Sequence, residues 1–263
     1  MHAFDWAVFW HYLWPGTALQ NPLIRNGLIT TILVSIIAQA LGVLLGLLAA
    51  LGKMSKFPPF RLLADAYIWY FRGTPLLVQM MLLFFGLGVT HIYDFPALVI
   101  GPVVISGAIQ AGTLALAINE GAYMAEIVRA GIESIDIGQM EAAKSLGMTF
   151  GQAMQRIILP QATKVIIPPL GNEFNNMMKT TSIMQVISAG ELFYGFTQIN
   201  ANLFLPFELF IAASFYYLAM TTIWSYIQGR IEASLGERKA AHTQPGLFQR
   251  MFGAMPAPHA GGH

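Results

Sequence analysis

The sequence predicts an all-α membrane protein with five transmembrane helices. Of its 263 residues, 56% are hydrophobic and only 10% are charged, and the mean hydropathy is +0.58. A soluble domain carries roughly a quarter of charged residues, so this composition favours a bilayer protein. The chain has no cysteine, which excludes disulfides, thiolate catalysis and cysteine-based metal sites.

The N-terminal segment, residues 1–22, is rich in aromatic side chains and lacks the basic region and cleavage site of a signal peptide. Its aromatic residues are Phe4, Trp6, Phe9, Trp10, Tyr12 and Trp14. Aromatic rings with a polar tip favour the headgroup zone of a membrane. The segment is therefore predicted to lie at the membrane interface.

Five stretches are apolar enough to cross about 30 Å of hydrocarbon as helices, which takes about 20 residues. They lie at about 27–52, 66–89, 103–128, 159–178 and 206–227, within a predicted transmembrane domain over 23–232. Pro168 and Pro169 predict a kink in the fourth span. Gly42 and Gly46, a small-xxx-small pair in the first span, favour close helix packing.

Lysine and arginine gather in alternate connections between these spans. The first, third and last connections carry Lys53, Lys56, Arg61, Arg129, Lys144, Arg156, Arg230, Arg238, Lys239 and Arg250. The other side carries only Arg25 and Lys179. Because positively charged loops stay in the cytoplasm, the N-terminus is predicted outside and the C-terminus inside. Residues 233–263, polar and rich in Gly, Pro and His, are predicted to form a disordered cytoplasmic tail.

The cytoplasmic loop 133–158 predicts a short helix, a turn at Gly147 and a second helix that feeds the fourth span. Residues 141–146 are good helix formers on balance, and apolar residues return at helical spacing from Phe150. Pro160 lies where a new helix can start. Such a low-relief unit can enter another protein's groove, or it can be an amphipathic helix on the inner leaflet. The residues alone leave both open.

A spaced pattern in this loop decides between the two. Glu141-Ala142-Ala143 is followed after three residues by Gly147, after nine more by Ile157, and after one more by Leu159-Pro160. This pattern resembles the EAA loop of importer-type ABC permeases. Four further segments resemble the polar amino acid uptake permeases of the histidine, glutamine and arginine type: FRGTPL at 71–76, AYMAEI at 122–127, LPQA at 159–162 and PPLGNEF at 168–174.

The resemblance covers about residues 21–232 and has one departure. The family commonly has Lys-Asp-Thr-Ser after the fourth span, where this chain has Lys179-Thr180-Thr181-Ser182. The missing carboxylate would face the outer side, and it bears on which solute is carried.

The resemblance implies a type I ABC importer permease fold in a bacterial inner membrane. It implies these partners: an ABC ATPase, a second permease subunit (identical or a sister chain), an extracytoplasmic solute-binding protein, a small polar amino acid and lipid, with no nucleic acid. The residues that it assigns to ATPase coupling are Glu141, Ala142, Ala143, Leu146, Gly147, Met148, Ile157, Leu159 and Pro160. The chain itself would be no enzyme and hold no cofactor, since ATP and Mg would be bound by the partner ATPase. Residues 46–54, the nearest approach to a phosphate loop, have the wrong spacing and no Ser or Thr for magnesium.

Polar residues at membrane depth are costly unless they face a cavity or a partner, which makes them candidates for a solute path. The predicted path residues are Asn119, Glu120, Tyr123, Asn172, Glu173 and Asn176. The alternative is that the asparagines bond helices together and that Glu126 and Arg129 form a structural pair. No catalytic or metal site is predicted, because the six histidines are scattered without ligand spacing.

The predicted function is therefore the permease subunit of an ATP-driven importer of polar amino acids. The alternative is a subunit of an ion-gradient-driven secondary transporter or channel, against which the EAA pattern argues. A membrane scaffold that only recruits partners is a third possibility. The sequence leaves open which amino acid is carried and whether the pore is a homodimer or a heterodimer.

Overall fold

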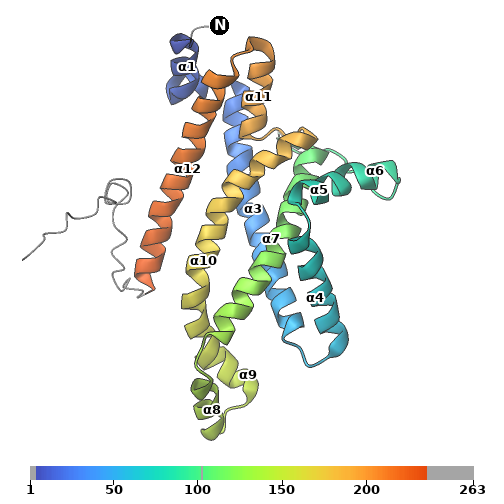
Figure 1. Ribbon diagram of the computed structural model, residues 1–263, viewed down its shortest axis with the longest axis vertical. Helices are drawn as coiled ribbons and strands as arrows, with labels where there is room; N and C mark the ends of the chain where they lie inside the picture. Colours follow the sequence, from blue (N-terminus) through green and yellow to red (C-terminus); the bar gives the residue numbers. More distant parts are fainter. Residues whose placement is uncertain (1–3, 102, 236–263) are drawn as a thin grey trace, which may run out of the picture.

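The computed structural model describes residues 4–101 and 103–235, which form a bundle of long helices with short helices at both ends (Figure 1). The helices are α1 (Trp6–Leu13), α2 (Pro15–Ala18), α3 (Pro22–Lys53), α4 (Pro58–Gly73), α5 (Leu76–Met81), α6 (Leu87–Val89), α7 (Gly107–Glu133), α8 (Ile137–Ser145), α9 (Phe150–Ala153), α10 (Leu159–Thr180), α11 (Leu192–Leu203) and α12 (Pro206–Ser234). π-Helical turns at Leu82–Gly86 and Met154–Ile158 and a 3₁₀ turn at Thr181–Ile187 continue neighbouring helices. One hairpin pairs β1 (Leu98–Ile100) with β2 (Val103–Ile105). The predicted tail, 233–263, lies almost wholly outside the described residues.

Two helices of the described chain, α3 and α12, are long and apolar enough to cross a membrane alone. They contain the predicted spans 27–52 and 206–227. Residues Pro58–Gly73 and Leu76–Val89 meet the same criteria only as a pair, bent by 106°. Helices α7 and α10 cover most of the other two predicted spans, but their polar and charged residues lower the hydropathy. The count of five spans thus stays a prediction, while the helical class is confirmed.

The predicted second span, 66–89, is not a single straight helix, because the chain changes direction at Thr74-Pro75. Thr74 has an extended backbone, with φ −121° and ψ 149°, as is usual for a residue before proline. Pro75 has no N–H to continue the helix, so α4 ends at Gly73 and α5 starts in a new direction. Hydropathy predicted one continuous span here because the residues on both sides of the break are apolar.

The predicted third span starts too early, because residues 103–105 belong to the hairpin. Leu98 pairs with Ile105 and Ile100 pairs with the first residue of β2, in an antiparallel register. Gly101 has φ +58°, a conformation that suits glycine in a tight turn. Helix α7 begins only after Ser106, whose side chain accepts a hydrogen bond from the N–H of Ile109.

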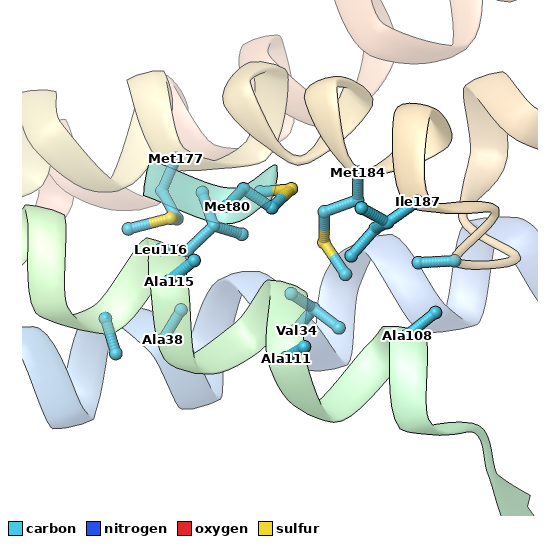
Figure 2. Packing of buried hydrophobic residues seen from close by; sticks show 12 residues of the cluster. Val34, Ala38, Met80, Ala108, Ala111, Ala115, Leu116, Met177, Met184 and Ile187 are labelled. Carbon is cyan, nitrogen blue, oxygen red and sulfur yellow. The ribbon is translucent and has the colours of Figure 1, made fainter. Parts of the chain in front are cut away.

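The centre of the bundle is built from small side chains on α3 and α7 (Figure 2). Ala38 on α3 and Ala111 and Ala115 on α7 are buried, and larger side chains such as Met184 fill the space above them (Figure 2). The predicted close packing at Gly42 and Gly46 is confirmed, because a methyl group at either position would overlap atoms of α7. Small residues let membrane helices approach closely, and this places α3 directly behind the polar residues of α7.

The predicted helix–Gly–helix unit lies at the end of the bundle opposite α1 and α11 (Figure 1). Gly147 has φ +79°, in the left-handed region, and reverses the chain between α8 and α9. The side chain of Thr149 and that of Gln152 cap the start of α9 reciprocally. Pro160 lies in the first turn of α10, as expected, but helical structure runs without a gap from Phe150 to Thr180. A π-helical turn directly before Leu159 accommodates the hydrogen bond that Pro160 cannot donate.

Candidate solute pathway and coupling loop

A cavity of about 400 Å³ between α5, α7 and α10 collects most of the polar residues predicted for the path. Its lining residues are Leu76, Leu116, Asn119, Glu120, Tyr123, Glu173, Asn176, Met177, Lys179, Thr180 and Ile183. Five of the six predicted path residues are thus brought together from two helices. They meet because residues three, four and seven apart share one face of a helix.

Glu120 is the deepest carboxylate of this cavity, with 7% of its surface exposed. Gln39 of α3 donates a hydrogen bond from Nε2 to Glu120 Oε1 at 3.1 Å. The Glu120 side chain lies over Gly42, where a methyl group would come within 2.7 Å of its Cγ. A glycine on α3 therefore makes the space that admits a carboxylate on α7, and a glutamine on α3 partly satisfies it. Sequence reasoning missed Gln39, although it is a lone amide in an apolar span.

The α10 side of the cavity supplies charges of both signs. Glu173 and Asn176 line it, and Lys179 and Thr180 continue the lining toward the end of the helix. Thr180 is the position at which the sequence departs from the Lys-Asp-Thr-Ser pattern, so this departure removes a carboxylate from the cavity wall. With Glu120, the cavity carries two carboxylates, one ammonium group and amide donors.

Asn119 lines the cavity and also holds the break between α4 and α5. Its Nδ2 donates to the carbonyl of Phe71 and to Oε1 of Gln79, both at 3.0 Å. Gln79 Nε2 in turn lies 3.0 Å from the carbonyls of Phe71 and Thr74 and 2.7 Å from Thr74 Oγ1. The amide of Asn119 thus bonds helices together, as the alternative for the asparagines predicted. Gln79 was missed, yet it is the only polar side chain in 76–89.

Asn172 is the predicted path residue that the cavity lining leaves out. Its Oδ1 accepts a hydrogen bond from Gln228 Nε2 of α12 at 3.3 Å, and the same nitrogen lies 3.2 Å from the carbonyl of Pro168. Trp224 of α12 donates to the carbonyl of Gly171 at 2.8 Å. Asn172 lies at the edge of the polar face of α10, where the amide of Gln228 meets it.

The predicted Glu126–Arg129 pair is present and belongs to a larger charge network. Glu126 accepts from Arg129 at 2.8 Å and from Lys53 at 2.9 Å, and Arg72 lies 3.9 Å away. Lys53 also approaches Asp65 at 3.4 Å. The network links α3, α4 and α7 to one another on the α8 side of the cavity. Arg72 also lies 5.4 Å from the ring centre of Tyr123, within the range of a cation–π contact.

The residues assigned to ATPase coupling divide between a buried and an exposed set. Ala143 is buried, and Ile157 packs against a cluster that includes Val128 and Ile158. The exposed ones are Glu141, Ala142, Leu146, Gly147, Leu159 and Pro160, and Met148 is half-buried. Leu146, the C-cap of α8, is 82% exposed, and Ile137, the first residue of α8, is 75% exposed, which leaves apolar side chains uncovered at this end of the bundle.

One protein family and several permeases of known class are similar to this chain. The family described as Binding-protein-dependent transport system inner membrane component matches residues 42–237. The probable glutamine ABC transporter permease protein GlnM of Bacillus subtilis is 38% identical over 213 residues, which are 80% of this chain and 93% of that protein. The arginine transport system permease protein ArtQ of Bacillus subtilis is 36% identical over 223 residues, 84% of this chain and 95% of that protein.

Two solved structures have a similar fold. One is described as the crystal structure of an amino acid ABC transporter with histidines. Its chain has 42% sequence identity and a TM-score of 0.74, and the match covers 83% of this chain and 97% of that one. The other is the MetNI methionine ABC transporter in an inward-facing conformation, with a TM-score of 0.67, 14% identity and coverage of 82% and 97%. At that identity the second likeness concerns the fold alone.

Proposed function

This chain belongs to the family of inner membrane components of binding-protein-dependent transport systems, and from this membership we propose that its cavity is the solute path of an ABC importer of polar amino acids. The expected permease class and importer fold are confirmed at the level of the family. The observation that supports the substrate class is the cavity between α5, α7 and α10, with its paired carboxylates and single lysine.

The chemistry of this cavity suits an amino acid zwitterion. Glu120 and Glu173 can accept hydrogen bonds from an ammonium group, and Lys179 and the amide of Asn176 can donate to a carboxylate. A volume of about 400 Å³ is within the range of small-molecule sites, roughly 300–1,000 Å³. A buried carboxylate at membrane depth is costly unless it faces such a cavity or a partner.

The exposed end of the bundle supports coupling to a separate ATPase. The apolar surface around Leu146 requires a partner, and the reversal at Gly147 presents it at the tip of a rigid unit continuous with α10. Since α10 also carries Glu173 and Asn176, movement of this tip would be transmitted along one helix to the cavity. We expect ATP and Mg to be bound by that ATPase, so the chain itself is no enzyme.

The remaining partners and the orientation follow from the same proposal. A second permease subunit completes the pore, and an extracytoplasmic solute-binding protein delivers the amino acid. The lysine-rich connections, which include the α8–α9 end, lie in the cytoplasm of a bacterial cell, and the N-terminus lies outside.

Uptake by the reconstituted transporter tests this function. Proteoliposomes that contain the permease, its ATPase and the solute-binding protein are loaded with ATP, and uptake of labelled amino acids is measured. Glu120→Gln is expected to lower uptake about 10- to 100-fold, because a charge-assisted hydrogen bond contributes about 1.5–3 kcal/mol. Glu133→Gln on the same helix, at an exposed site, is the control and should retain uptake. Uptake that needs an ion gradient and no ATPase would refute the proposal.

A further inference from the structure

Helix α1 presents three exposed tryptophans on one side. Trp6, Trp10 and Trp14 are 62%, 56% and 66% exposed. Their spacing of four residues places them on one ridge of the helix and its C-cap, about 6 Å apart along the axis. We call Trp6, Trp10 and Trp14 the tryptophan row. Rings of this size are rarely left uncovered in water without a binding role.

The opposite side of α1 attaches the tryptophan row firmly to α12. Phe9 is buried, and Val8, Tyr12 and Leu13 are partly buried against a cluster that includes residues of α12 (Figure 1). Asp5 accepts hydrogen bonds from the N–H groups of Ala7 and Val8 at 3.0 Å, which caps the helix.

A long-range hydrogen bond fixes the same attachment. The N–H of Asp5 donates to Oε1 of Glu208, in the first turn of α12, at 2.9 Å. Glu208 is buried, and this bond gives it a partner. The height of the tryptophan row relative to α12 is therefore set by the fold.

The charge and surroundings of the tryptophan row indicate what covers it. The exposed side of α1 consists of the row, Ala7 and His11, with no acidic residue, lysine or arginine. It lies beside the end of α12, a helix with the length and composition to cross a membrane (Figure 1). The apolar surface continues onto α12 at Phe207, which is 67% exposed.

Lipid at the membrane interface matches this chemistry. Tryptophan combines an apolar ring with one N–H donor and is enriched where hydrocarbon meets the headgroups. We propose that the tryptophan row binds the headgroup–acyl boundary of the bilayer and so sets the depth of α12 in the membrane. This inference does not depend on the transported solute. The proposed orientation enters only in naming the leaflet, which is the outer one.

Fluorescence quenching in nanodiscs tests this inference on the full chain. Tryptophan emission is recorded in lipids brominated near the headgroup, in lipids brominated near the acyl chain end, and with aqueous iodide. The chain also contains Trp69 and Trp224, so the variant Trp6→Phe/Trp10→Phe/Trp14→Phe is measured in parallel. The difference between the two proteins isolates the emission of the row and leaves the hydrogen bond of Trp224 intact.

The expected result is that shallow bromine quenches the emission of the row at least about twofold more than deep bromine or iodide does. Stronger quenching by iodide would show that water covers the row, and stronger quenching by deep bromine would place it in the hydrocarbon core. Protection from all three quenchers would show that protein covers it, for example a second subunit. Each of these three results would overturn the inference. None of them bears on uptake, so the proposed function is tested separately.

Discussion

Two substitutions of Gly147 test separately the backbone shape of the coupling loop and its contact with the partner ATPase. Gly147 has φ +79°, and nothing lies within 4 Å of the position that a Cβ would take. Gly147→Ala therefore meets only backbone strain, about 1–2 kcal/mol for a left-handed residue. That is small beside a typical unfolding free energy of about 5–15 kcal/mol, so the variant should fold and insert.

Gly147→Asp adds an anionic side chain to the same backbone. Aspartate tolerates the left-handed conformation better than alanine does, so its strain within the chain is no larger. Burial of its charge in a protein groove would cost several kcal/mol. We therefore expect normal insertion and a loss of ATP-driven uptake of at least about 100-fold.

The assay for both variants is ATP hydrolysis and uptake in proteoliposomes, with membrane insertion checked by extraction and gel filtration. Gly151→Asp is the matched control, because Gly151 also has open space around it but lies in α9 without a positive φ. Uptake should rank wild type and Gly151→Asp first, Gly147→Ala next and Gly147→Asp last. Normal uptake by Gly147→Asp, or equal losses in both aspartate variants, would refute the coupling role of this position.

Three further substitutions test the packing and the cavity. Gly46→Val should lower the unfolding free energy by about 1–3 kcal/mol, because the added side chain overlaps α7. The control Gly229→Val, in open space on α12, should change it by less than about 0.5 kcal/mol. Equal thermal stability of the two variants in nanodiscs would contradict this prediction. Gln79→Leu removes the hydrogen bonds at the break after α4 and should destabilise the fold by about 2 kcal/mol, at roughly 0.6 kcal/mol per bond, measured by chemical unfolding. Thr180→Asp restores a carboxylate to the cavity wall and should raise uptake of arginine relative to glutamine at least about fivefold in competition assays, by Coulomb attraction. An unchanged ratio would remove Thr180 from the selection of solute.

The helices and the turn of the coupling loop were predictable because residues close together in the sequence determine them. Helix formers at 141–146, the interruption at Gly147 and the return of apolar residues from Phe150 are properties of neighbours in the chain. The structure has α8, a left-handed glycine and α9 at these places. Pro160 lies in the first turn of α10, and only the π-helical turn that joins α9 to α10 without a gap was not predicted.

The cavity was predictable in part. The sequence predicted Asn119, Tyr123, Glu173 and Asn176 as path residues, and all four line the cavity. The same prediction included Asn172, and it did not reveal that this residue, at the edge of the polar face of α10, bonds to α12 instead. Which neighbour a boundary residue meets depends on how two distant helices pack.

By itself the sequence determined the helical class, through composition and hydropathy, and the family, through the resemblance of the EAA pattern and four further short segments, because each is written in residues close together in the chain. Only the tertiary structure decided that the second hydrophobic stretch bends by 106°, that Gln39 and Gln79 support the polar residues of α7, and that the tryptophans of α1 form a row attached to α12. These features join residues up to 203 positions apart. The physical reason is that an amide or an indole acquires its role from the partner that packing brings to it.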